Sequence, residues 1–273
     1  MPEFSLLLFS VDELVIRSAV RAGVAGIVVD WERAGKNARQ AAADTEINTH
    51  TVVDLRRVRR ATDGLVICRI NGPDRGSVEE VDAAIDAGAD EILVPMVRRR
   101  ADVEVVLDRV RGRCRVGMLI ETVDAVERAP ELCELPVSRV YVGLNDLAID
   151  RGGGGGNIFE AVADGTVDRV RKACPLPFGF GGLTLPDAGS PIPCRLLIAE
   201  MARLGANFSF LRRSFHRDMR GRDMGVEVPR LCAALESAHR RSAAEVRRDT
   251  QAFDDAVRCA ATATAPAPRS VVA

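Results

Sequence analysis

The chain has 273 residues, of which 47% are hydrophobic and 28% are charged. It can therefore bury one large core, and α/β barrels commonly have about 250 residues. With a formal net charge of -1 and an aromatic share of 4%, it has neither a basic field nor many rings for stacking bases, so nucleic acid is not an expected partner.

In chain order, short apolar runs alternate with amphipathic segments. The runs have the length of buried strands and cover residues 4–9, 26–29, 65–70, 91–94, 116–120, 140–143, 177–182 and 207–211. Helical spacing predicts helices at residues 11–22, 36–43, 51–60, 77–88, 101–110, 122–130, 158–172, 193–204 and 228–248.

These eight strands, most of them about 25 to 40 residues apart, are typical of strand-helix repeats. We expect an α/β fold, a (β/α)8 TIM barrel that forms a single domain over residues 1–248. The alternative is an open doubly wound sheet, but no GxGxxG follows the first strand. Residues 249–273 end in a stretch rich in Ala, Thr and Pro, and we expect a partly disordered tail there.

The N-terminus and the cysteines indicate the compartment. Glu3 and a short apolar run before Asp12 fit neither a signal peptide nor a membrane span. The seven cysteines are scattered and lack CxxC spacing, which argues against a disulfide framework and against a zinc site. We therefore expect a cytoplasmic protein with reduced thiols and no membrane partner.

Charged side chains follow several of the predicted strands. In a barrel, active-site groups project from the C-terminal ends of the strands. That rule selects Asp30, Glu32, Arg69, Glu121, Asp146, and Arg212 or Arg213 after the last strand. Gly143, which ends the strand at residues 140–143, is expected to bind substrate together with Arg69 and Arg212.

The charges of this set predict a metal site. Glu121 and Asp146 follow neighbouring strands joined by a helix, so their carboxylates are expected to lie close together. Mg2+ usually takes one or two protein carboxylates and leaves positions for substrate oxygens, such as those of a 2-oxo acid. It would polarise the keto oxygen and stabilise an enolate, while Arg69 holds the substrate carboxylate. The expected cofactor is Mg2+, or another divalent cation such as Mn2+.

Each of these residues also has a purely structural interpretation. Glu121 and Asp146 stand where a carboxylate can cap a helix, and Arg69 could simply pair with a buried acid. Asp30 and Glu32 could orient Arg69 or metal-bound waters instead of acting as bases.

Two more segments allow alternatives. Arg212 and Arg213 either bind an anionic group or belong to a solvated arginine cluster. Five consecutive glycines at residues 152–156 lack the Lys-Ser/Thr of a phosphate loop, and we interpret them as a mobile loop.

Five segments in this order, VVDWE, ICRING, ADEILVPMV, VGMLIET and VYVGLNDLAIDRG, resemble the HpcH/HpaI aldolase and citrate lyase beta-subunit family of the phosphoenolpyruvate/pyruvate barrel group. The resemblance implies a Mg2+-dependent barrel that makes or cleaves carbon-carbon bonds beside a pyruvate, oxaloacetate or acyl-thioester enolate. It implies that Arg69 binds substrate and that Glu121 and Asp146 hold the metal. Asp30 and Glu32 match the acidic pair after the second strand.

One departure from this family concerns proton transfer. Aldolases of the pyruvate type usually have a histidine directly after the acidic pair, whereas this chain has Arg33. None of His50, His216 and His239 lies in a matching motif. Proton transfer would then fall to a metal-bound water, a substrate carboxylate or Glu32.

We therefore predict a carbon-carbon lyase or aldolase that acts through an enolate on a small 2-oxo acid, 3-hydroxy acid or acyl thioester. The alternatives are a decarboxylase or other enolate-forming enzyme for an oxaloacetate-like acid, and a catalytically silent member that binds a metabolite or a partner subunit. The link to residues 36–39 is shorter than in the citrate lyase branch, which leaves thioester use open. Such barrels often assemble, so a homo-oligomer is expected, with residues 228–248 as a candidate contact.

Overall fold

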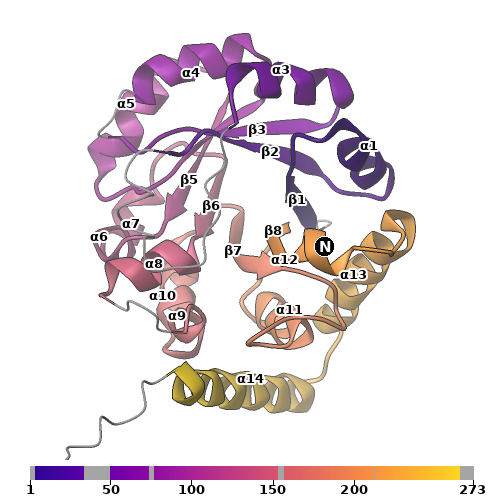
Figure 1. Cartoon of the computed structure of the whole chain (residues 1–273). Helices are drawn as coiled ribbons and strands as arrows, with labels where there is room; N and C mark the ends of the chain where they lie inside the picture. The colour runs from indigo at the N-terminus through magenta and orange to yellow at the C-terminus, as the bar shows by residue number, and fades with distance from the viewer. Residues whose placement is uncertain (1–3, 34–49, 74–76, 153–156, 212, 265–273) are drawn as a thin grey trace, which may run out of the picture.

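Eight short strands form the centre of the molecule. The computed structural model describes residues 4–33, 50–73, 77–152, 157–211 and 213–264. The strands are β1 (Ser5–Phe9), β2 (Gly26–Asp30), β3 (Leu65–Arg69), β4 (Glu91–Val94), β5 (Arg115–Ile120), β6 (Arg139–Val142), β7 (Phe178–Leu183) and β8 (Phe208–Leu211). Each strand pairs in parallel with the next, and β8 pairs with β1, so the sheet is closed (Figure 1). The predicted (β/α)8 barrel is confirmed, and the open sheet is excluded.

The helices surround this barrel (Figure 1). They are α1 (Glu13–Arg21), α3 (Val52–Ala61), α4 (Ser77–Asp86), α5 (Arg100–Val110), α6 (Val123–Glu127), α7 (Ala129–Leu132), α8 (Leu144–Asp150), α9 (Glu160–Ala163), α10 (Thr166–Ala173), α11 (Cys194–Arg203), α12 (Arg213–Asp218), α13 (Met224–His239) and α14 (Ala243–Thr264). The helix predicted at residues 36–43 lies outside the described residues. Among the helices that the structure describes, none combines the length and apolar character needed to cross a bilayer.

Local signals in the sequence explain where several helices begin. The Asp12 side chain accepts the N–H groups of Leu14 and Val15 at the start of α1. Thr51 and Asp54 form a capping box at the start of α3. The helix predicted at residues 158–172 is divided, because Gly165 has a positive φ of 79° between α9 and α10.

The barrel interior is filled by a core layer of side chains that alternate along the strands. This core layer consists of Leu7, Val28, Ile67, Leu93, Leu119, Tyr141, Phe208 and Phe210. Tyr141 and Phe210 lie with ring centroids 4.2 Å apart. Gly179 on β7 leaves room for them, because a Cβ there would lie 3.0 Å from the Tyr141 ring. The barrel is therefore solid beneath its C-terminal end.

The C-terminal region differs from its prediction. Residues 228–248 are not one helix, since α13 ends at His239 and α14 begins at Ala243. The expectation of a tail from residue 249 is wrong as far as Thr264, because α14 packs against α11 and α9 (Figure 1). Phe253 is fully buried there and meets the Phe159 ring edge to face at 6.4 Å. Residues 265–273 lie outside the described residues.

The Phe253→Ala variant tests whether α14 belongs to the folded unit. Removing this buried ring leaves a cavity, and we expect a loss of about 3–5 kcal/mol in the free energy of unfolding by urea. Gln251→Ala, an exposed change in the same helix, is the matched control and should cost less than about 0.5 kcal/mol. Equal stability of the two variants would contradict the packing of α14.

Candidate active site at the C-terminal end of the barrel

The alternation that fills the barrel also positions the charged side chains. Residues two positions apart in a strand face the same side of the sheet. Asp30, Arg69 and Glu121 each follow a member of the core layer by two positions, so they face the barrel axis at the ends of β2, β3 and β5. Asp30 and Arg69 are also direct partners in the pairing of β2 with β3.

Among the described side chains at this end of the barrel, Arg69 forms ion pairs with two of the predicted acids, Asp30 and Glu32. Its Nε and Nη2 atoms donate to the two carboxylate oxygens of Asp30 at 2.9 and 2.8 Å. Its Nη1 lies 3.2 Å from Glu32 Oε2, and both acids are almost completely buried. Burial alone would lower the pKa of Arg69, but the charges of Asp30 and Glu32 raise this pKa well above its ordinary value. The guanidinium therefore stays charged.

Arg69 keeps donors for a further anion. A guanidinium has five N–H groups, and Asp30 accepts two of them. Further N–H groups on Nη1 and Nη2 belong to a side chain that is 14% exposed. The ring of Phe9, at the end of β1, lies 5.4 Å from the guanidinium carbon and forms one wall beside it.

Glu121 is held by the loop after β4. Its Oε1 accepts the Met96 N–H at 2.8 Å, and its side chain is packed against Gly143. Burial raises the pKa of Glu121 well above its ordinary value, and the charges of Asp146 and Glu32 raise it further. Arg69 and the Met96 N–H act in the opposite direction. The two predicted metal ligands and the arginine are therefore within electrostatic range of one another.

Asp146 lies in the first turn of α8, directly after β6, and is 9% exposed. Its charge, like that of Glu32, acts on the carboxylate of Glu121. Among the described residues, no three His, Cys, Asp or Glu side chains converge as a metal cluster. Mg2+ needs only one or two protein carboxylates, and a second carboxylate close to Glu121 fits such a cation.

Gly143 has a steric role that the sequence did not reveal. It is the N-cap of α8, and a Cβ at this position would lie 2.9 Å from Glu121 Cβ and still closer to its carboxylate. A side chain at residue 143 would therefore displace Glu121. The expected substrate contact of Gly143 stays a prediction.

Gly143→Ala should accordingly weaken cation binding. We expect about tenfold weaker Mn2+ binding, because the carboxylate of Glu121 must move. Titration followed by electron paramagnetic resonance of free Mn2+ measures this change. Gly72→Ala is the control at the same end of the barrel, since its Cβ would meet Met96 Cβ at an ordinary 3.5 Å. Unaltered Mn2+ affinity in Gly143→Ala would contradict the steric argument.

The remaining predicted residues are two arginines and the glycine run. Arg212 lies outside the described residues, as do residues 153–156 of the glycine run. Arg213 begins α12 and is exposed. The prediction that one of these arginines binds an anionic group stays a prediction.

The structure adds His50, which sequence reasoning missed. Its Nδ1 accepts the Asp30 N–H at 3.1 Å, and its carbonyl accepts Arg33 Nη2 at 2.5 Å. Arg33 stands where the family's histidine was expected, and its backbone N–H donates to Asn71 Oδ1 at 2.8 Å. The signal available in the sequence was the position of His50 beside Thr51, the residue that caps α3.

Residues 4–177 match the family described as HpcH/HpaI aldolase/citrate lyase. No curated protein matches the chain significantly in sequence.

Solved structures share the fold. An HpcH/HpaI aldolase/citrate lyase family protein from Burkholderia cenocepacia J2315 has a TM-score of 0.62 and 15% identity, over 80% of this chain and 91% of that one. The HpcH/HpaI aldolase from Desulfitobacterium hafniense DCB-2 has a TM-score of 0.59 and 16% identity, over 88% and 95%. The citrate synthase SbnG has a TM-score of 0.58 and 19% identity, over 81% and 91%.

Proposed function

Since the chain belongs to the HpcH/HpaI aldolase/citrate lyase family of carbon-carbon lyases, we propose that it makes or cleaves a carbon-carbon bond in a small carboxylate-bearing substrate, through an enolate. The substrate class is a 2-oxo acid, a 3-hydroxy acid or an acyl thioester. The observation that supports this most is the position of Arg69, Glu121 and Asp146 at or directly after the C-terminal ends of β3, β5 and β6, where the charges of Arg69 and Asp146 both act on Glu121.

Glu121 and Asp146 would hold a divalent cation, Mg2+ or Mn2+. Once bound, this cation supplies the positive charge that polarises a carbonyl group and stabilises an enolate. The Met96 N–H fixes one oxygen of Glu121, and Gly143 leaves space for the other. The carboxylate of Glu121 is therefore held in one orientation instead of rotating freely.

Arg69 would bind the carboxylate of the substrate. Asp30 accepts hydrogen bonds from Nε and Nη2 of Arg69, which fixes the direction of the remaining N–H groups on Nη1 and Nη2. A planar guanidinium held in this way can select a carboxylate by shape as well as by charge.

Glu32 is the side chain that we propose for proton transfer. It lies beside Arg69 Nη1 and is 1% exposed, so it is shielded from bulk water. Arg33 cannot replace a histidine base, because a guanidinium offers only N–H donors and no acceptor, and its Nη2 donates to the His50 carbonyl. Asp30, with both oxygens bound to Arg69, would instead orient the arginine.

Hydrogen exchange from pyruvate tests the enolate step. With Mg2+ or Mn2+ in deuterated water, the methyl protons of pyruvate should exchange faster with the protein than without it, as followed by proton NMR. Chelation of the cation with EDTA should abolish this exchange. Binding of such acids without exchange, and without turnover of any 2-oxo or 3-hydroxy acid, would favour a catalytically silent member. Release of carbon dioxide from oxaloacetate would favour the decarboxylase.

We also propose a cytoplasmic location and a homo-oligomeric assembly. The seven free thiols support the first. The exposed side chains of Leu14 on α1, Val53 on α3 and Val226 on α13 support the second, because large apolar groups at the surface favour contacts between copies. Light scattering during size-exclusion chromatography measures the assembly.

A further inference from the structure

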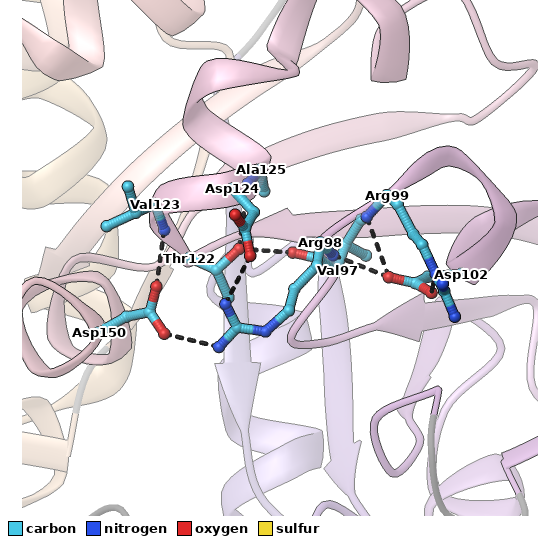
Figure 2. A network of polar contacts seen from close by, with 9 residues as sticks. All are labelled: Val97, Arg98, Arg99, Asp102, Thr122, Val123, Asp124, Ala125 and Asp150. Carbon is cyan, nitrogen blue, oxygen red and sulfur yellow. Dashed lines mark hydrogen bonds and ion pairs between the residues drawn. The ribbon is translucent and has the colours of Figure 1, made fainter.

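Arg98, in the loop between β4 and α5, connects this loop to two other elements (Figure 2). Its Nη1 donates to Asp124 Oδ2 in α6 at 2.9 Å, and its Nη2 donates to Asp150 Oδ1 in α8 at 2.6 Å. The second oxygen of Asp150 accepts the Val123 N–H at 2.8 Å. Asp150, the last residue of α8, is thereby fixed to both α6 and the loop.

The same loop also holds Glu121. Met96, two residues before Arg98, donates its N–H to Glu121 Oε1. Between Met96 and Arg98, the carbonyl of Val97 accepts the Thr122 hydroxyl at 2.7 Å (Figure 2). Met96 adopts a φ of 54°, a left-handed conformation that residues other than glycine rarely take. Three consecutive residues therefore link Glu121, the start of α6 and the end of α8.

Helix α8 needs such support. It has seven residues, which is too short to be stable by itself, and its N-cap Gly143 makes no side-chain cap bond. Asp146 and Asp150 are four residues apart in this helix, so they lie on the same face. A contact that fixes Asp150 therefore also fixes the direction of Asp146.

We propose that Arg98 is a positioning residue that sets Asp146 against Glu121, so that the two carboxylates can share one divalent cation. This inference rests on the proposed function. Arg98 does not touch the cation or the substrate, and it acts through Asp150 and α8.

If Arg98 acted only through its charge, removing it would strengthen cation binding, because a positive charge near two carboxylates would be lost. If Arg98 positions Asp146, removing it should weaken cation binding. Asp150→Asn removes a negative charge, so charge and positioning both predict weaker binding for this variant. Arg98→Ala is therefore the variant that separates geometry from electrostatics.

The experiment measures Mn2+ affinity by electron paramagnetic resonance in the full-length chain. Arg98→Ala and Asp150→Asn should each bind Mn2+ about tenfold more weakly than the wild-type chain, and the double variant should be no weaker than Arg98→Ala. Arg98→Lys should recover part of the affinity, because lysine can reach one carboxylate at a time. Arg98→Lys keeps the proposal testable if Arg98→Ala fails to fold, because the charge is unchanged and any loss of affinity then comes from geometry.

Arg99→Ala is the matched control. Arg99 is the next residue, its side chain is 72% exposed, and it pairs with Asp102 within its own helix. This variant should bind Mn2+ as tightly as the wild type, or slightly more tightly. Wild-type affinity in Arg98→Ala, or an equal loss in Arg99→Ala, would overturn the positioning role. A wild-type chain that binds no Mn2+ would overturn the proposed function, and this inference with it.

Discussion

The Glu121→Gln variant is expected to lose divalent-cation binding and to turn over substrate about a thousandfold more slowly. The amide keeps an oxygen for the Met96 N–H, so the side chain retains its anchor while losing its charge. The metal-free variant should be at least as stable as the wild type. The reason is that burial and the charges of Asp146 and Glu32 raise the pKa of Glu121, which means that its ionised form is costly in the folded state.

Three measurements check this expectation: Mn2+ titration, steady-state turnover, and thermal unfolding without metal. Glu127→Gln is the control, since Glu127 is exposed on α6 and the change removes the same charge. A Glu121→Gln variant with undiminished Mn2+ affinity and turnover would remove Glu121 from the proposed site.

The second large effect concerns Arg69. Arg69→Met would remove the positive charge that lies against buried Asp30 and Glu32, and we expect a loss of about 3–5 kcal/mol in the free energy of unfolding. Adding Asp30→Asn should recover part of this loss, because one of the two buried negative charges is removed. Urea unfolding at neutral pH measures both variants.

Arg69→Lys separates binding from stability. Lysine retains the charge but cannot present two parallel N–H groups, so the KM for a carboxylate substrate should rise about tenfold or more while the fold persists.

The control for Arg69→Met is Arg115→Met, at the opposite end of β5. It removes an arginine that is 53% exposed and should cost less than about 1 kcal/mol in the free energy of unfolding. Equal effects of the two arginine-to-methionine changes would contradict a special environment for Arg69.

The barrel could be predicted because each strand is a short apolar run that ends in a turn or a charge. The alternation within strands then determined which charges face the axis, as Asp30, Arg69 and Glu121 do. Pairing of β2 with β3 and of β5 with β6 follows from chain order in a closed parallel sheet. These features depend on local patterns that one sequence displays.

Other features depend on contacts between distant segments. Nothing near Arg98 in sequence indicates that its partners are Asp124 and Asp150, and the contact of His50 with Asp30 crosses a long connection. The start of α14 could have been predicted from the sequence, because Ser242 and Glu245 have the spacing of a capping box and form one in the structure. Composition alone suggested a tail, although alanine is a strong helix former when an apolar surface is available for packing.

The core layer below the site has a kinetic consequence. Tyr141, Phe208 and Phe210 pack together across the barrel axis, so in the proposed site reactants would enter and leave from the C-terminal end of the barrel. The molecule bound deepest, against Arg69 and the carboxylates, would then arrive first and depart last. In the bond-forming direction this would give a compulsory order of addition, in which a second reactant in large excess traps the first one inside.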